Sequence, residues 1–321
     1  MLLQKLGKVL LWVAGILIII ISVPVIIFWQ PDQSLAELKP KWINEQSEFI
    51  DLGGMQVHIR DEGNPESDHT LVLIHGTGAS LHTWEAWVEE LASSYRVISL
   101  DLPGYGLTGP HPEHDYRGEK YADIIAQLIK QRNASNVVLA GNSLGGYIAW
   151  VTATLHPERI NGLVLIDSSG MPSKAKSVPV GFKLARLPGF NFLLENVLPR
   201  RVIRSSLENV YGDPDKVTDQ LVDRYFDMAT REGNRNAIRQ PRKRSQIEDL
   251  RTKLSNLSVP CLIQWGEKDQ LIPVEAAYKF KELMPHCELV TYPELGHVPH
   301  EEDPAETLTA LKTFIESLKT N

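Results

Sequence analysis

The sequence is poor in the features that define several large classes of protein. It has only two cysteines among 321 residues, too few for a disulfide framework or a cysteine-rich zinc site. Its 22 glycines and 20 prolines follow no period, which excludes collagen-like and low-complexity chains. It also lacks an excess of basic residues, because the net charge is −7 and the pI about 5.8. Nucleic acid is therefore not an expected partner.

The motifs of the common cofactor and metal sites are also missing. No glycine-rich stretch has the spacing that cradles a phosphate group. Two histidine pairs, His111/His114 and His297/His300, lack the H-E-x-x-H arrangement of a zinc enzyme. We therefore expect no cofactor and no metal.

What remains has the composition of a globular protein, with 43% hydrophobic and 23% charged residues. A length of 321 residues fits one large domain with an additional element, or two small domains.

An uncharged run from Val9 to Trp29 stands at the N-terminus. Its length of about twenty residues predicts a helix that crosses a bilayer. A cleaved signal peptide is the alternative, but the run is longer than such a peptide needs and no small-residue cleavage site follows it. Lys5 and Lys8 precede the run, so the positive-inside rule favours a single-pass anchor with the rest of the chain outside the cytoplasm. The membrane is then an expected partner.

Short apolar runs alternate with helical stretches over the rest of the chain. Two β-prone segments flank Gly53-Gly54, as in a two-residue hairpin. The apolar runs that follow are 71–74, 96–100, 137–140, 163–166, 262–265 and 289–292, and residues 121–129 have helical periodicity. This pattern predicts an α/β protein with a mostly parallel sheet of eight strands, covered by helices on both faces.

The alternation breaks between residues 171 and 245, where the chain is helical in character and basic. This segment has fifteen Lys and Arg against eight Asp and Glu, and we interpret it as an insertion between two strands. Arg231, Arg235, Arg239 and Arg242 recur at helical spacing, and Lys243 and Arg244 extend the cluster. Either these residues pair with acidic groups of the remaining chain, or they face an anionic lipid surface.

The chemistry is expected at the ends of strands. Residues 137–140 run into Gly141-Asn142-Ser143-Leu144-Gly145, which is the G-x-S-x-G pattern between a strand and a helix. A nucleophile on so sharp a turn leaves no room for side chains two residues before and after it, so glycines at 141 and 145 expose the Ser143 hydroxyl. Ser143 is the predicted nucleophile.

A serine hydroxyl needs a base, and the base needs an acid that orients it. His297 lies in the loop after the last predicted strand, and Asp269 lies in the loop after the strand before it. Asp167 also follows a strand and is the alternative to Asp269 as the orienting acid. Asp101 follows another strand, but we interpret it as a turn residue. The order Ser143, Asp269, His297 is that of an α/β-hydrolase triad.

Acyl transfer also needs donors for the developing oxyanion. The backbone N–H groups of Thr77, in a loop after an early strand, and of Leu144, at the start of the helix after Ser143, are the predicted donors. His75 in the same loop is interpreted as a packing residue.

From about residue 49 to residue 318 the sequence resembles a serine hydrolase of the α/β-hydrolase superfamily. The motifs that carry the resemblance are HGTG at 75–78, DLPGYG at 101–106, GNSLGG at 141–146, GEKDQLIP at 266–273 and GHVPHEEDP at 296–304. Membrane-anchored monoacylglycerol lipase-like members match the 9–29 run, and Ser143 argues against the members with an aspartate nucleophile. Asn142 resembles carbon–carbon bond hydrolases of ring-fission products, but Val298 stands where those have an aromatic residue.

The resemblance implies a serine esterase or lipase that cleaves carboxylic esters, such as acylglycerols or other lipid-like esters, through an acyl-enzyme. A carbon–carbon hydrolase and a catalytically silent binding protein are the alternatives. The expected organisation is an anchor at 1–30, a linker at 31–48, a core at 49–170 and 246–321, and a lid at 171–245. If the strands at 262–265 and 289–292 are adjacent, as the superfamily implies, Cys261 and Cys287 lie within or near disulfide range.

Overall fold

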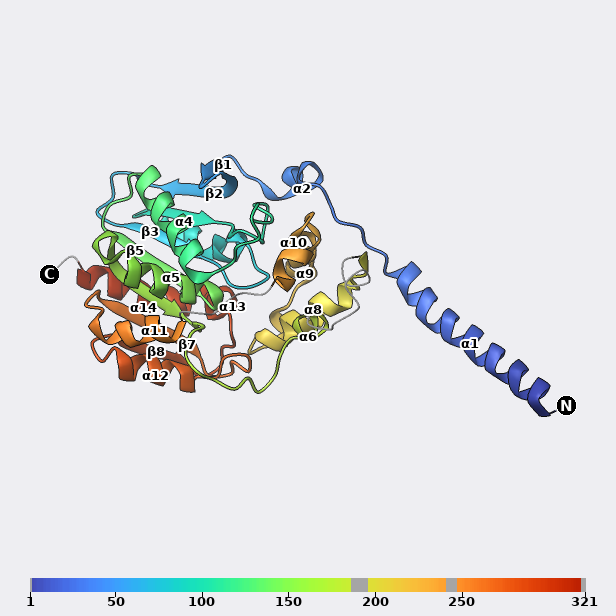
Figure 1. Ribbon diagram of the computed structural model, residues 1–321. Helices are drawn as coiled ribbons and strands as arrows, with labels where there is room; N and C mark the ends of the chain where they lie inside the picture. Colours follow the sequence, from blue (N-terminus) through green and yellow to red (C-terminus); the bar gives the residue numbers. More distant parts are fainter. Residues whose placement is uncertain (1, 186–195, 241–246, 319–321) are drawn as a thin grey trace.

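An eight-stranded sheet forms the centre of the computed structural model, which describes residues 2–185, 196–240 and 247–318 (Figure 1). The strand order is β1-β2-β4-β3-β5-β6-β7-β8. β2 is antiparallel to β1 and to β4, and all other neighbours are parallel. The strands are β1 (Ser47–Leu52), β2 (Met55–Gly63), β3 (Thr70–Ile74), β4 (Arg96–Leu100), β5 (Val137–Asn142), β6 (Ile160–Ile166), β7 (Cys261–Gly266) and β8 (Glu288–Tyr292). The predicted fold class is confirmed for the sheet.

The predicted hairpin at Gly53-Gly54 joins β1 to β2. Leu52 pairs with Met55, and the two glycines have φ values of +65° and +85°. A two-residue turn of this kind needs positive φ at both positions, which glycine adopts without strain.

Helices cover both faces of the sheet because the buried strands present apolar side chains to both. In β3, Val72 and Ile74 pack toward α4, α5 and α12, whereas Leu71 and Leu73 pack toward α3 and α14. The helices outside the insertion are α1 (Leu2–Ile27), α2 (Leu35–Trp42), α3 (Glu85–Leu91), α4 (Gly118–Gln131), α5 (Leu144–Leu155), α11 (Ile247–Lys253), α12 (Glu275–Leu283), α13 (Pro299–Glu302) and α14 (Pro304–Leu318), with 3₁₀ turns η1 (Leu81–Trp84), η2 (Pro157–Arg159) and η4 (Leu254–Asn256).

The insertion between β6 and β7 is helical over its described part. It contains α6 (Val180–Ala185), α8 (Arg200–Val210), η3 (Pro214–Lys216), α9 (Asp219–Thr230) and α10 (Asn234–Arg239). These helices gather on one side of the sheet, between the sheet and α1 (Figure 1). The helical spacing of the arginines holds only in part, because Arg235 and Arg239 lie in α10, whereas Arg231 lies between α9 and α10, before Gly233 turns the chain at φ +84°. Arg242, Lys243 and Arg244 lie outside the described residues.

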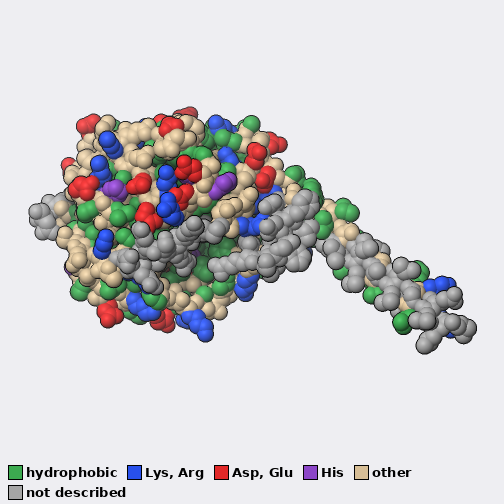
Figure 2. Space-filling view, viewed as in Figure 1, with side chains coloured by type: hydrophobic (Ala, Val, Ile, Leu, Met, Phe, Trp, Pro, Cys, Tyr) green, Lys and Arg blue, Asp and Glu red, His purple; other side chains and the backbone are tan. Residues whose placement is uncertain are grey.

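The N-terminal run forms α1, which projects away from the body (Figures 1 and 2). A helix that crosses a bilayer needs about twenty predominantly apolar residues in succession. Among the residues that the structure describes, no helix meets the length and apolarity of such a span. The prediction of a single-pass anchor with an extracytoplasmic catalytic domain is therefore wrong.

Residues 28–42, which we call the N-terminal strap, lie along the insertion. Gln33 Nε2 and Trp42 Nε1 each donate a hydrogen bond of 3.0 Å to the carboxylate of Asp227 in α9. Arg235 Nε in α10 donates to Asp32 Oδ1 at 2.9 Å. The segment predicted as a linker thus contains α2 and binds the insertion through polar contacts that periodicity does not reveal.

The contacts of the basic insertion favour ion pairing within the molecule. Arg235 pairs with Asp32 of the strap, and Arg224 pairs with Glu301 beside the last loop of the core. Acidic and basic side chains are interspersed on the visible face of the body (Figure 2).

The two cysteines lie next to each other at the start of β7 and β8. Leu262 pairs with Glu288, and Cys261 and Cys287 each precede one of these residues, so their predicted proximity is confirmed. Both are buried free thiols. Burial and the neighbouring Cys287 raise the pKa of the Cys261 thiol, which keeps it protonated.

Candidate active site

Ser143 lies on the turn between β5 and α5, as predicted. Its φ of +55° and ψ of −113° are unusual for a residue with a side chain, and its backbone N–H donates to Ile166 O at 2.9 Å. The flanking glycines allow this turn. A Cβ at Gly145 would lie 2.0 Å from Ile74 O, and one at Gly141 would lie 2.3 Å from the backbone of Gly145. The predicted collision is therefore the reason for both glycines.

Asp269 and His297 are joined by a hydrogen bond of 2.6 Å between Oδ2 and Nδ1. Asp269 follows β7 and is buried, and its second oxygen, Oδ1, accepts the N–H groups of Leu271 and Ile272 at 2.8 and 3.0 Å. His297 follows β8, and its backbone N–H donates to Val210 O at 2.7 Å. Asp269 is thus held by its own loop and oriented toward the imidazole.

Asn142 connects this pair to the turn that carries Ser143. Its side-chain amide donates to His297 O at 2.9 Å and to Ile166 O at 3.2 Å. The predicted residues Ser143, Asp269 and His297 therefore follow the carboxyl ends of the parallel strands β5, β7 and β8, and Asn142 links the turn of Ser143 to the loop of His297. The sequence motif contains Asn142 but gives no sign that its amide reaches the histidine loop.

The two rival carboxylates have other partners. Asp167 is fully buried after β6 and accepts the Gly266 N–H at 3.1 Å. Asp101 is more than the turn residue that the sequence indicates. It is fully buried and accepts bonds from His58 Nδ1, Leu81 N and Leu107 N at 2.7, 2.8 and 2.8 Å. Burial opposes its charge, but His58 outweighs burial and holds the pKa of Asp101 below its usual value.

The side chains of Asp167, Asp269 and His297 have donor atoms within 4.8 Å of one another, which is the spacing of a possible metal site. The hydrogen bond between His297 Nδ1 and Asp269 Oδ2 accounts for the closeness of two of these three groups. His300, the other histidine of the pair in the sequence, contacts Thr83 Oγ1 at 3.0 Å through Nε2.

The predicted oxyanion donors flank Ser143. A Cβ at Gly76 would lie 3.2 Å from Ser143 Cβ, so the loop that carries Thr77 touches the turn. Leu144 begins α5, where the first N–H groups have no acceptor within the helix. His75 accepts the Leu102 N–H at 3.0 Å, and burial lowers its pKa. It is a neutral packing residue, as the sequence indicates.

The insertion covers the histidine loop. Val298, next to His297, packs in an apolar cluster with residues of the insertion, namely Leu207, Tyr211, Val217 and Val222. A second contact of the insertion lies at the loop that carries Thr77. There the ring of Phe182 in α6 comes within 4.0 Å of the point where a Cβ on Gly78 would lie. Apolar side chains therefore approach both the histidine loop and the loop of Thr77.

Glu302 joins the insertion to the histidine loop and is a residue that the sequence analysis missed. Its buried carboxylate accepts the N–H groups of Gly296, Gly212 and Asp213 at 2.8, 2.9 and 2.8 Å. It lies in the motif GHVPHEEDP at 296–304, five residues after His297, but the motif does not reveal three backbone donors.

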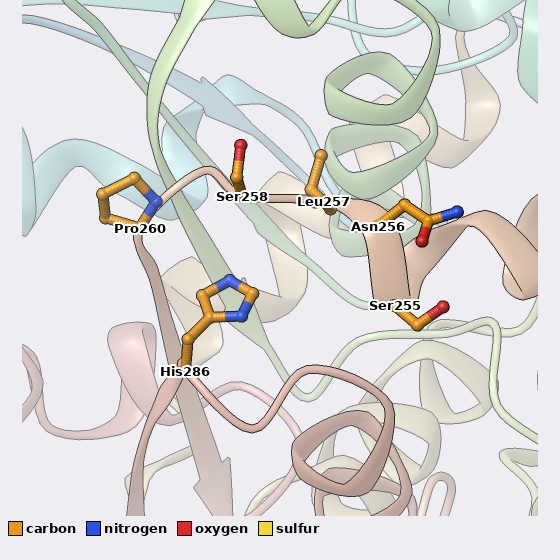
Figure 3. Close-up of a pocket in the computed structure, with 6 residues that line it drawn as sticks. All are labelled: Ser255, Asn256, Leu257, Ser258, Pro260 and His286. Atoms are coloured by element: carbon orange, nitrogen blue, oxygen red, sulfur yellow. The ribbon is translucent and has the colours of Figure 1, made fainter.

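Figure 3 shows a second region, a hollow of about 530 Å³ that contains none of these residues. It is lined by Ser255, Asn256, Leu257, Ser258, Pro260 and His286. These residues precede β7 and β8, whereas Asp269 and His297 follow the same strands. The hollow is therefore at the other end of the sheet.

Comparison with known proteins agrees with this geometry. Residues 69–304 match the family model described as alpha/beta hydrolase fold. The chain is 28% identical over 291 residues, 86% of this chain and 95% of the relative, to the 2-hydroxy-6-oxo-6-(2′-aminophenyl)hexa-2,4-dienoic acid hydrolase of Metapseudomonas resinovorans. It is 30% identical over 251 residues, 77% of this chain and 95% of the relative, to the pimeloyl-[acyl-carrier protein] methyl ester esterase of Klebsiella pneumoniae strain 342.

Among solved structures, a bacterial membrane phospholipase A is similar over 100% of both chains, with a TM-score of 0.72 and 24% identity. At that identity the likeness shows the fold. The match to the family model covers well over half of the chain and includes Ser143, Asp269 and His297. The chain therefore belongs to the α/β-hydrolase family and is a hydrolase of this fold.

Proposed function

We propose that this hydrolase cleaves carboxylic esters by way of an acyl-enzyme. The observation that carries the proposal is the 2.6 Å bond between His297 Nδ1 and Asp269 Oδ2, linked by Asn142 to the strained turn of Ser143. A carboxylate-oriented imidazole of this kind supports the role of His297 as the base that activates the Ser143 hydroxyl.

In the first half-reaction Ser143 Oγ attacks the ester carbonyl carbon, and its proton passes to His297 Nε2. The tetrahedral intermediate collapses with cleavage of the bond to the alkoxy oxygen, which takes the proton from His297 and leaves as the alcohol. In the second half-reaction water adds to the acyl-enzyme in the same way, and the acid and free Ser143 are released. Asp269 holds the imidazole in one tautomer and stabilises the imidazolium throughout.

The N–H groups of Thr77 and Leu144 are the proposed donors to the oxyanion. Leu144 adds the positive end of the α5 dipole, which favours negative charge at this point.

The proposed substrate is a small-molecule or lipid-like ester with an apolar acyl part, and the insertion at 171–245 is its lid. Apolar insertion residues packed around Val298, and Phe182 near Gly78, support an apolar acyl group. The relative that is a methyl ester esterase supports ester cleavage.

A carbon–carbon hydrolase of ring-fission products is the second candidate. The support for it is the relative from Metapseudomonas resinovorans, which is named as a hydrolase of a dienoic acid and is matched over 95% of its length. The two functions differ in what they hydrolyse. We expect p-nitrophenyl esters to be cleaved and 2-hydroxy-6-oxo-6-phenylhexa-2,4-dienoate to be left intact. The reverse result would replace the ester proposal.

A fluorophosphonate probe tests the nucleophile directly. We expect the probe to label the wild-type protein, and Ser143→Ala to abolish both labelling and ester cleavage. Ser255→Ala, which changes an exposed serine in the remote hollow, is the control and should do neither. Absence of labelling in folded wild-type protein would favour the catalytically silent binding protein.

A further inference from the structure

We propose that Asp167 is a protonated carboxylic acid that donates a hydrogen bond to Asp269. Asp167 is thus a positioning residue, which sets the basicity of His297 through Asp269. This inference rests on the proposed function, in which His297 is the base.

The carboxyl group of Asp167 is placed for this role. One of its oxygens accepts the Gly266 N–H at 3.1 Å, while the other, Oδ2, is buried and has no hydrogen-bond partner among the described residues. Donor atoms of Asp167, Asp269 and His297 lie within 4.8 Å of one another. A buried carboxylate oxygen without a partner costs free energy, whereas a proton on Oδ2 would be a donor that Asp269 can accept.

The surroundings of Asp167 also favour the neutral acid. Burial raises its pKa most, the negative Asp269 raises it further, and Glu302 adds to the effect, whereas the Gly266 N–H opposes it. Tyr292, at the end of β8, is a further titratable group near it, and burial raises the pKa of that phenol well above its usual value. His300, near His297, has its pKa lowered to about 3 by burial and is neutral.

A donor to Asp269 has a defined effect on the base. It withdraws negative charge from the carboxylate that faces His297, so that the imidazolium is stabilised less. Removal of the donor should therefore stabilise the imidazolium of His297 relative to the neutral imidazole that accepts the Ser143 proton.

The test measures the imidazole of His297 by NMR titration in full-length Ser143→Ala protein, which needs no turnover. Asp167→Asn keeps a neutral donor of the same shape, and Asp167→Leu keeps the branched shape without a donor. We expect the Asn variant to leave the pKa of His297 unchanged, and the Leu variant to raise it by about half a unit or more. The acidic limb of the kcat/KM profile should move in the same way when Ser143 is present.

Two outcomes would overturn the proposal. A lower pKa of His297 in Asp167→Asn would mean that Asp167 is ionised in the wild type, because the substitution would then have removed a negative charge. An unchanged pKa in Asp167→Leu would mean that no donor acts on Asp269. If the Leu variant does not fold, the Asn variant alone decides between a neutral and an ionised Asp167. Failure of wild-type protein to cleave esters would instead count against the proposed function and would leave the titration readable.

Discussion

The side-chain amide of Asn142 donates a 2.9 Å hydrogen bond to the backbone oxygen of His297, across 155 positions of sequence. The residue before the proposed nucleophile therefore holds the loop of the proposed base. The distance between Ser143 and His297 depends on this bond because the two lie on separate loops.

Removing the Asn142 amide should reduce activity more than stability. Asn142→Ala deletes the hydrogen bonds to His297 O and Ile166 O, each worth about 1 kcal/mol, and the histidine loop should shift, so we expect kcat/KM to fall about tenfold or more. Asn136→Ala is the matched control, since its amide donates to the backbone oxygen of Asp68 far from the site. Equal kcat/KM for both variants would contradict the role given to Asn142.

Glu302 should be needed for the stability of the insertion and of the histidine loop together. Glu302→Gln leaves one oxygen for three backbone donors and turns an amide toward them, so we expect a loss of about 2–3 kcal/mol in the free energy of unfolding. Urea denaturation measures this loss, and ester hydrolysis should fall in parallel. The exposed Glu306→Gln is the control. A wild-type unfolding curve for Glu302→Gln would refute this prediction.

The buried His300 should make the protein less stable as the pH falls. Burial, then the nearby His297 and Arg224, lower its pKa to about 3, while an unfolded histidine titrates near 6.5. Between these values the unfolded chain binds a proton that the folded protein resists, so His300 contributes a loss of about 1.4 kcal/mol per pH unit. His300→Gln should reduce the slope of unfolding free energy between pH 6 and pH 4, whereas His114→Gln, at an exposed site, should leave it unchanged.

The N-terminal strap should hold the insertion in place through Asp227. Its carboxylate accepts hydrogen bonds from Gln33 and Trp42, and Asp227→Ala removes both bonds to a charged acceptor, at a cost of about 3 kcal/mol. We expect faster hydrogen exchange in α9 and α10 and faster proteolysis of the insertion. Asp223→Ala removes an exposed carboxylate of the same helix and is the control. If both variants exchange alike, the strap does not restrain the insertion.

The sheet and the turn of Ser143 could be predicted because each depends on local chemistry. Apolar runs such as Arg96–Leu100 became strands at the expected residues, and Gly141 and Gly145 are required by contacts within one turn. The choice of Asp269 over Asp167 also followed from position, since Asp269 lies in the loop after β7, the strand that precedes β8 and His297 in the chain.

The remaining features depend on contacts between distant segments. Asn142 and Glu302 both lie within motifs of the sequence, but the motifs do not show that each side chain binds backbone groups of another segment. Asp101 was interpreted as a turn residue because the sequence does not show its hydrogen bond to His58, which lies 43 positions away in the chain. The single-pass anchor was inferred from an uncharged run alone, and the described structure contains no helix with the properties of a span.

The N-terminal strap also bears on how the chain folds during synthesis. Gln33 is separated from Asp227 by 194 residues, so the strap leaves the ribosome about 10–40 s before its partner helix has been made. The core strands β1 to β6 can pair in that interval, but the strap has no insertion to bind. Its apolar residues at 28 and 29, which remain partly exposed even in the finished protein, would then be open to solvent and to other chains. A fragment that begins at β1 would avoid this exposed stage, and it would also lack the residues that complete the insertion.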